Sequence, residues 1–558
     1  MCDTQQAANR WKTGAGWEKR SASAEYRAGA ELFLSGFSPE SPGGSGDTFS
    51  GLDLEPRARA HIMEEAFAPE DAAQQARARA LFADHLHRPA TIHTIELHGA
   101  RNTRAGFLDP LFRPLVDPGG NAGTTLGDVI DRLEDLTGKL DRLDVFHPRP
   151  TIHLAEASQA DPAAAADDVD VFVRVAEKSR LVFKAGTEVG NTEGGAYTNA
   201  LLRNVLGGAE TLSVHASAGT RTRSAYSATL SAPVRGNPDV RLGAEVLASS
   251  VQKPWASHDE AVTGGAVRLE HRTRAGDTHA LAWAGTWRQL TGLASTASPT
   301  VRNDAGDSVK SCLSHTYTRD RRDNRLLPQR GYLVRTVCEL AGWGPLRGDV
   351  SYSKTEVEVS GAVPLALPGV GGGGGGGGAS VGGGLRLGLL YPLPFGYALG
   401  GPVAPSRIND RFQLGGPTDV RGFALGGLGP HDGPDSVGGD VLAAAGVHVL
   451  LPLPRAGPAS PLRLQLFANG GRLVALREGG RTKGAAAVTA ADAAAAWRGL
   501  RAAVHDLAAG WPSTAAGIGL VYAHPAARFE LNFSLPLVLR RGESCRKGLQ
   551  VGVGINFL

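Results

Sequence analysis

The feature that most constrains this chain is the strand pattern that begins near residue 181 and continues to residue 558. Segments of strand length recur there with turn residues between them, and helical periodicity almost disappears. The clearest segment is RFELNFSLPLVL at 528–539. One of its faces carries Phe529, Leu531, Phe533, Leu535 and Leu537, and the other carries Glu530, Asn532 and Ser534. This alternation predicts strands with one apolar and one polar face.

The strand count can be estimated from the same pattern, and it is about sixteen. The predicted strands begin near residues 181, 195, 209, 222, 239, 264, 279, 309, 331, 349, 381, 440, 461, 514, 527 and 548. An even count favours a closed antiparallel barrel. Two low-complexity inserts, at 371–378 and 483–510, interrupt the strands, and the second has helical propensity. Both inserts are expected to be loop excursions.

Two environments remain open for these strands. No window holds the 18 or more consecutive apolar residues that a membrane-spanning helix requires. A barrel strand, in contrast, spans a bilayer with about ten residues, apolar toward lipid and polar toward the interior. A soluble β-sandwich shows the same alternation. Periodicity alone therefore fits a membrane barrel and a sandwich equally well.

The residues before the strands fall into two parts. Residues 1–87 have little periodicity and predict a mostly flexible arm. Residues 88–180 predict a compact α+β domain with the order β-α-α-β-β, whose sheet edge could accept another strand. Its first helix is expected to break near Pro110. Its second helix has an apolar face made of Leu126, Val129, Ile130, Leu133, Leu136 and Leu140.

Composition argues against several functional classes. The formal charge is +3 and 20% of residues are charged, so there is no electrostatic case for nucleic-acid binding. The four cysteines form no CxxC pair, which argues against a zinc site and a disulfide framework. No metal site, cofactor site, catalytic triad or carboxylate pair is predicted from spacing. The chain is therefore not expected to be an enzyme.

The longest connection without a predicted strand, 394–438, contains RFQLGGPTDVRGF. Its Gly415, Gly416 and Pro417 permit a tight reversal, and Gly422 permits a positive φ. An arginine is too costly to bury alone, but inside a polar lumen Arg421 could bond a carboxylate and hold the loop there. Glu530, on the polar face of its strand, is a candidate partner. The alternative is an ordinary surface loop with an exposed arginine.

The chain ends with GLQVGVGINFL, which predicts a final strand. Leu549, Val551, Val553, Ile555 and Phe557 share one face, and Gln550, Gly552, Gly554 and Asn556 share the other. A closing barrel strand places its last aromatic side chain at the membrane interface. Glycines on the other face weaken packing there.

These segments carry a resemblance. LGGPTDVRGF, which contains Val420, Arg421, Gly422 and Phe423, resembles the loop signature of the BamA-like outer-membrane barrel-insertase superfamily. Gln550, Gly552, Ile555 and Phe557 fit the terminal targeting pattern of that superfamily. Residues 88–180 look like a single polypeptide-transport-associated (POTRA) domain. With 202–234 and 252–260, this resembles the core subunits of the mitochondrial sorting and assembly machinery.

The resemblance implies a fold, a function and partners. The fold would be a 16-stranded transmembrane β-barrel (181–558) after one POTRA domain. The chain would insert β-barrel precursors into the mitochondrial outer membrane by templating strands at a seam between its first and last barrel strands. Membrane lipids, metaxin-like accessory subunits and the cristae-organising complex would be partners, with the POTRA domain in the intermembrane space. A passive solute channel and a chloroplast envelope polypeptide translocon are the alternatives.

Overall fold

The computed structural model describes residues 11–13, 85–116, 124–148, 150–159, 161–162, 164–190, 193–343, 347–365, 378–393, 406–453, 460–476, 490–524 and 527–554. The chain forms two compact units: residues 1–178 with 206–209 and 235–238, and the remaining residues. Within the described ranges, no helix has both the length and the apolar character needed to cross a membrane.

The first unit contains one mixed sheet and two helices. Its elements are β1 (Trp11–Thr13), β2 (Thr91–His98), α3 (Ala105–Val116), α5 (Leu126–Arg142), β3 (Thr151–Glu156), the 3-10 turn η1 (Ala157–Gln159) and β4 (Asp168–Arg174). The sheet order is β1-β2-β4-β3. The predicted β-α-α-β-β order is present from β2 to β4. The additional strand β1 comes from the predicted arm and pairs in parallel with the free edge of β2; residues 1–10 and 14–84 lie outside the described residues.

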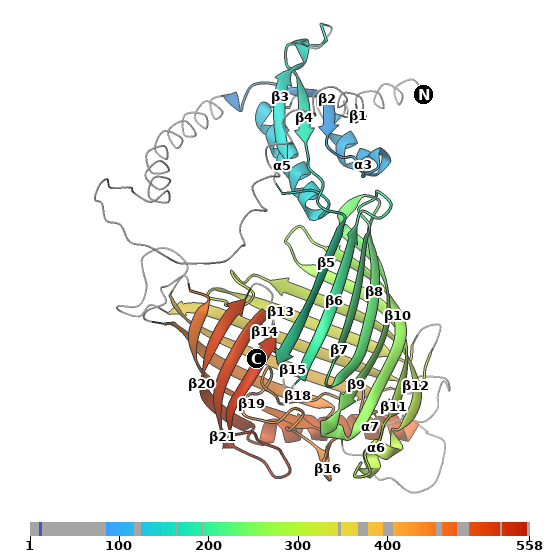
Figure 1. The fold of residues 1–558 in the computed structure, drawn as a ribbon, viewed down its shortest axis with the longest axis vertical. Coiled ribbons are helices and arrows are strands. Elements are labelled where there is room, and N and C mark those ends of the chain that lie inside the picture. Colours follow the sequence, from blue (N-terminus) through green and yellow to red (C-terminus); the bar gives the residue numbers. More distant parts are fainter. Residues whose placement is uncertain are drawn as a thin grey trace, which may run out of the picture. The chain divides into compact units, whose positions relative to one another are not determined.

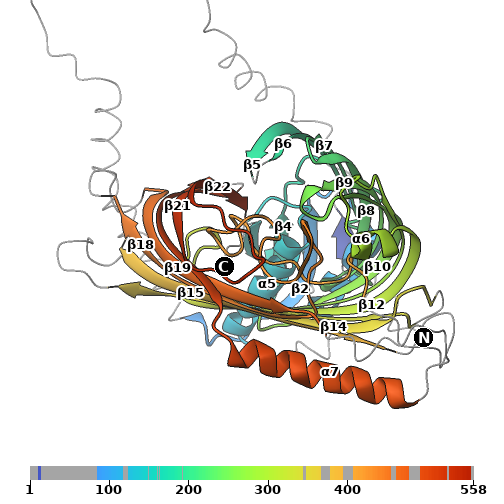
Figure 2. The same ribbon diagram turned by 90° about the horizontal axis from the view of Figure 1, so that it is seen from below.

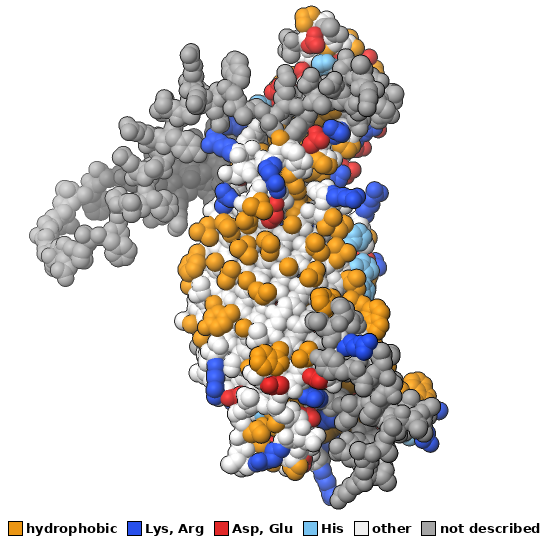
Figure 3. All heavy atoms as spheres, turned by 90° about the vertical axis from the view of Figure 1, so that its right-hand side faces the viewer, with side chains coloured by type: hydrophobic (Ala, Val, Ile, Leu, Met, Phe, Trp, Pro, Cys, Tyr) orange, Lys and Arg blue, Asp and Glu red, His pale blue; other side chains and the backbone are white. Residues whose placement is uncertain are grey.

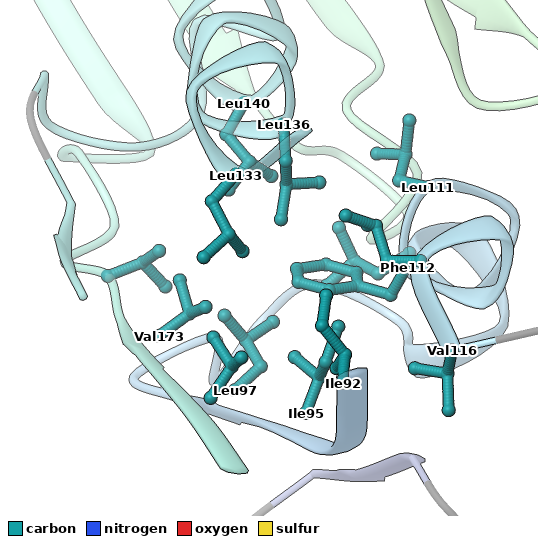
Figure 4. Close-up of a cluster of buried hydrophobic side chains, with 14 of the residues drawn as sticks. Ile92, Ile95, Leu97, Leu111, Phe112, Val116, Leu133, Leu136, Leu140 and Val173 are labelled. Carbon is teal, nitrogen blue, oxygen red and sulfur yellow. The ribbon is translucent and has the colours of Figure 1, made fainter. Parts of the chain in front are cut away.

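The core of this unit lies between the sheet and the two helices (Figure 4). The second helix, α5, begins with a capping box, in which Thr125 and Asp128 satisfy each other's backbone N–H groups. The backbone and side-chain hydrogen bonds from Thr125 lower the pKa of the exposed Asp128 carboxyl. Four members of its predicted apolar face are buried: Val129, Leu133, Leu136 and Leu140.

The first helix corrects one prediction, because α3 continues through Pro110 instead of breaking there. A proline inside a helix costs about 3 kcal/mol or more. The helix also buries Leu108, Leu111, Phe112, Leu115 and Val116 at helical spacing. Each such side chain contributes roughly 1.5–3 kcal/mol on burial, so packing against the sheet outweighs the proline penalty.

The second unit is a 16-stranded antiparallel sheet that curves around an interior (Figures 1 and 2). In chain order its strands are β5 (Leu181–Gly190), β6 (Glu193–Arg203), β7 (Thr211–Gly219), β8 (Thr222–Val234), β9 (Asn237–Lys253), β10 (His258–Arg272), β11 (Thr278–Thr291), β12 (Gly306–Asp320), β13 (Gly331–Ala341), β14 (Tyr352–Leu365), β15 (Ala379–Pro392), β18 (Val441–Pro452), β19 (Leu462–Val474), β20 (Ser513–His524), β21 (Ala527–Val538) and β22 (Gly548–Gly554). Shorter elements are η2 (Pro254–Ala256), α6 (Pro299–Asn303), the hairpin β16 (His431–Asp432) with β17 (Asp435–Ser436), and α7 (Ala490–Ala509).

The observed strands agree closely with the predicted ones. The largest difference is β10, which begins at His258 instead of near residue 264, because η2 joins it to β9 in a very short turn. Of the predicted inserts, residues 371–377 lie outside the described residues, and part of 483–510 forms α7. The connection 394–438 is not wholly without strands, since it contains the hairpin β16–β17 around Gly433.

The sixteen-stranded antiparallel sheet confirms the predicted fold, although in the described residues the sheet is not closed between its first and last strands. The pairing order runs from β22 at one edge to β5 at the other, and in the described residues these two strands are not hydrogen-bonded neighbours. In the described residues, β22 pairs with β21 over Gly548–Gly554. Its glycines contribute no side-chain packing that would hold a neighbour.

Antiparallel order fixes which connections share a rim. We call the rim where β5 begins at Leu181 the near rim, and the opposite one the far rim. Strands in odd positions of the order, such as β15, β19 and β21, run in the direction of β5 and end at the far rim. The connections β15–β18, β19–β20 and β21–β22 therefore all lie at the far rim.

The two faces of the sheet differ as the alternation predicts. On β21, Phe529, Leu531 and Phe533 point outward and are 39–55% exposed, whereas Glu530 and Asn532 point inward and are buried. Figure 3 shows hydrophobic side chains spread over the middle of the wall, with charged side chains gathered toward its two ends. An apolar outer wall around a polar interior is typical of a membrane barrel and not of a sandwich.

Candidate functional site: the lumenal loop and the terminal hairpin

The β15–β18 connection folds into the interior of the sheet instead of extending into solvent. Its described part, residues 406–440, buries Phe412, Leu414, Phe423 and Leu428 in one cluster with side chains of the wall. By volume, Arg421 is the largest fully buried side chain among the described residues. We call residues 406–440 the lumenal loop.

Arg421 bonds the carboxylate of Glu530 on β21. Its Nε lies 2.9 Å from Glu530 Oε2, and its Nη2 lies 3.3 Å from Oε1. Arg421 is 1% exposed and its guanidinium stacks over the ring of Phe467 at 5.1 Å. The structure thus brings together the two residues that the sequence suggested as partners. The planar fork of arginine suits this two-point contact.

Glu530 also has partners that the sequence did not indicate. Arg528 Nη2 lies 2.6 Å from Glu530 Oε1, and Asn532 Nδ2 donates to Oε2 at 2.7 Å. One buried carboxylate is therefore shared by two guanidinium groups and an amide. Arg528, Glu530 and Asn532 occupy every second position of β21, so all three side chains face inward. The sequence shows this alternation, but it does not show which of these side chains bond to one another.

The residues after Arg421 bind the last strand. The N–H of Gly422 donates to Gln550 Oε1 at 2.9 Å, and Gln550 Nε2 donates to the carbonyl of Phe423 at 3.3 Å. Phe423 also forms an antiparallel bridge with Cys545 in the β21–β22 connection. The N–H of Arg546 donates to the Gly422 carbonyl at 2.9 Å. The lumenal loop is thereby attached to both strands of the terminal hairpin β21–β22 and to its turn.

The segment before Arg421 shapes the loop. Gly415 and Gly416 have φ values of +108° and +134°, which residues with a side chain rarely adopt. Pro417 and Val420 are buried, and the N–H of Gly416 donates to the Val420 carbonyl at 3.3 Å. The Asp419 carboxylate accepts the N–H of Gly415 at 3.1 Å. This closed turn directs Arg421 toward β21.

A second attachment joins the loop to the opposite part of the wall. Asp410 is 2% exposed and receives two bonds from Arg288 on β11, at 2.7 and 3.2 Å. The Tyr352 hydroxyl lies 2.9 Å from its carboxylate, and Lys354 Nζ donates to its backbone carbonyl at 2.8 Å. Burial alone would raise the pKa of Asp410, but the charges of Arg288 and Lys310 hold it below its ordinary value. Sequence reasoning missed this cluster.

The seam residues are placed in part. Gln550 and Gly552 face the interior, whereas Ile555 and Phe557 lie outside the described residues. Leu549 and Val551 on β22 point outward and are 61% and 49% exposed, as are Leu181 and Phe183 on β5 at 62% and 64%. Each of the two sheet edges therefore carries an apolar outer face.

The loop predicts a stability difference between two of its glycines. Gly422 has φ +88°, and an added Cβ would lie 2.7 Å from Ala515 Cβ. Gly422→Ala is expected to destabilise the protein by roughly 2–4 kcal/mol through backbone strain and overpacking. Gly433→Ala, at φ +62° with open space around it, should cost about 1 kcal/mol. Urea unfolding of the two variants measures the difference; equal losses would contradict the close packing at Gly422.

Comparison with known proteins agrees with this architecture. Residues 204–557 match the Omp85 superfamily domain. Among solved structures, BamA from Haemophilus ducreyi lacking POTRA domains 1-3 has a TM-score of 0.62 at 15% identity, covering 84% of this chain and 85% of that chain. At this identity the likeness concerns the fold alone.

Several curated proteins are more similar to this chain in sequence than that structure is. A SAM50-like protein of Schizosaccharomyces pombe is 37% identical over 86% of this chain and 93% of its own length. The sorting and assembly machinery component 50 homologs of Bos taurus and Homo sapiens are 34% and 33% identical, each over 77% of this chain and 84% of its own length. The chain therefore belongs to the Omp85 superfamily and, within it, to the family of sorting and assembly machinery component 50 proteins.

Proposed function

We propose that this protein inserts β-barrel precursors into the mitochondrial outer membrane by offering the edges of β5 and β22 to incoming strands. The observation that carries the proposal is the open sheet: in the part of the chain that the structure describes, β5 and β22 are not hydrogen-bonded to each other, while the terminal hairpin is held from inside by the lumenal loop. An open edge with a fixed backbone is a template for a further strand.

The physical problem is the entry of a strand into lipid. Each backbone N–H or C=O that enters hydrocarbon without a partner costs several kcal/mol. A precursor strand that forms ladder bonds with β5 or β22 as it enters avoids this cost. The apolar outer faces of both edges match the alternation that a barrel strand presents to lipid. No covalent bond changes, so the catalysis concerns a folding barrier.

Partners and location follow as part of the same proposal. The clients are β-barrel precursor polypeptides, whose terminal strands would pair with β5, and membrane lipids surround the wall. The names of the relatives include sorting and assembly machinery. We add metaxin-like accessory subunits and the cristae-organising complex as proposed partners, on the resemblance described in the sequence analysis. The α+β unit, as a POTRA domain, would receive precursors in the intermembrane space.

Depletion tests the function directly. When this protein is depleted, newly imported β-barrel precursors should accumulate unassembled, because no template lowers the barrier to their insertion. Native electrophoresis of radiolabelled precursors measures their assembly. Outer-membrane proteins anchored by a helix are the matched control and should be unaffected. Normal barrel assembly with impaired solute flux would favour a passive channel, and arrested transport of soluble polypeptides would favour a translocon.

A further inference from the structure

Helix α7 lies outside the curved sheet, along its outer wall (Figure 2). It belongs to the β19–β20 connection and hence to the far rim. Leu500 and Ala503 are buried against the wall, and Leu507 packs beside them. Arg472 on β19 fixes the helix further, since its Nη1 donates to the Leu507 carbonyl at 3.1 Å. The helix is therefore docked and is not a free excursion.

The wall residues beneath α7 show its level on the barrel. Leu389 and Tyr391 on β15, Val441 on β18 and Val474 on β19 belong to the same cluster as Leu500. Each of them occupies an outward-facing position and stands within a few residues of the strand end at the far rim. Side chains farther along the same strands, such as Leu387 and Val447, are 41% and 59% exposed. The helix thus borders the apolar part of the wall on its far-rim side.

The wall covers only part of the apolar face of α7. At 100° per residue, Trp497 and Val504 project beside Leu500 on one flank. They remain 55% and 45% exposed. The Trp497 ring meets Tyr391 edge to face at 6.4 Å, and Trp511, just after the helix, is 86% exposed. An apolar flank with exposed tryptophans is thus left without a protein cover among the described residues.

Basic side chains lie beside this apolar flank, on the side of the helix that is farther from the wall. Arg498, Arg501 and His505 are exposed and lie on the side next to Trp497 and Val504. Tryptophan and tyrosine favour the level of the lipid headgroups, and arginine reaches from there to phosphates. A helix of 20 residues is about 30 Å long. Its order of wall-facing, apolar and basic strips is that of a helix lying in a membrane surface.

We propose that α7 is an in-plane membrane helix, which binds the headgroup region of the leaflet at the far rim through Trp497, Val504 and the two arginines. The occupant of its open flank is lipid because the flank continues the lipid-facing wall. The exposed apolar side chains that the structure describes here, Trp497, Val504 and Trp511, are also far too small a surface for a stable protein interface, which buries about 800 Å² per partner. The helix contacts β15, β18 and β19, so β20 and β21 separate it from the edge of β22. The helix therefore fixes how deeply the barrel wall sits in the bilayer, and it leaves the edges of β5 and β22 accessible.

Spin labels on the full chain test this placement. The natural cysteines are replaced by serine, and single cysteines are introduced as Val504→Cys, Arg498→Cys and, as a buried control, Ala503→Cys. Each variant is reconstituted into phosphatidylcholine vesicles that contain an anionic phospholipid, and its nitroxide is exposed to oxygen or to a water-soluble nickel chelate. The label at 504 should favour oxygen, the label at 498 should favour nickel, and the label at 503 should be shielded from both.

Each other result overturns the proposal. Strong nickel access at both 498 and 504 would place the helix in water. Shielding of both from the two reagents would indicate a protein cover. The pair Arg498→Gln and Arg501→Gln provides a second measurement without altering the apolar flank. In this background the oxygen preference at 504 should become less dependent on anionic lipid; an unchanged dependence would remove phosphate from the interaction.

Discussion

A covalent cross-link between β5 and β22 is expected to stop insertion of precursors in every molecule that carries it. One cysteine replaces Val551 on β22 and another replaces Leu181 or Phe183 on β5, in a chain without its natural cysteines. All three positions point outward, so a bifunctional maleimide can join them without entering the lumen. Insertion of a radiolabelled precursor should fall in proportion to the cross-linked fraction.

The physical reason is the loss of the template. When β5 and β22 are joined covalently, no room is left for a third strand between them. The backbone of an incoming strand would then face lipid without hydrogen-bond partners. The matched control joins Phe183 to Ala200 on β6, because these residues are already direct partners in the sheet. This control cross-link should leave insertion unchanged. Full insertion by a quantitatively cross-linked seam would refute templating at these edges, whereas a passive channel would conduct equally with either link.

Glu530→Gln is expected to destabilise the barrel by about 3–5 kcal/mol, the cost of breaking a buried ion pair. The substitution removes the carboxylate that Arg421 and Arg528 share, and leaves two buried guanidinium groups beside each other. Arg421→Met should cost less, because Arg528 still neutralises Glu530. The unfolding free energies of both variants, from denaturant titrations, give the order of the two effects. Protease sensitivity of the lumenal loop should rise in the same order.

An exposed pair in the same wall supplies the control. Arg335 and Glu358 lie 3.9 Å apart on neighbouring strands, with side chains 48% and 25% exposed. Exposed pairs contribute about 0–1 kcal/mol, so Glu358→Gln should have little effect. If Arg421→Met were as damaging as Glu530→Gln, the shared carboxylate would not be the centre of the cluster.

The strands could be predicted from the sequence because their signal is local. Alternation within 528–539 depends only on which face meets lipid, and the observed β21 spans Ala527–Val538. The same alternation places Glu530 inside, where a loop arginine can reach it. Near Pro110 a local rule failed, because the packing of α3 on its sheet depends on residues far away in sequence.

The cluster around Asp410 could not be predicted for a related reason. Arg288 and Asp410 are 122 residues apart, and their contact depends on how deeply the lumenal loop enters the sheet. Spacing in the sequence carries no information about that depth. The open sheet was likewise hidden: sixteen strands suit a closed cylinder, and only the pairing order shows that the described residues of β5 and β22 are not hydrogen-bonded to each other.

The lumenal loop forms a strut across the interior. At one end its Asp410 is bonded by residues of β11 and β14, and at the other end the loop is bonded by Glu530 and Gln550. The described residues of β5 make no hydrogen bond to the described part of this strut. When the seam between β5 and β22 widens, we therefore expect an asymmetric movement. The terminal hairpin β21–β22 should stay in place, and the strands that begin with β5 should move.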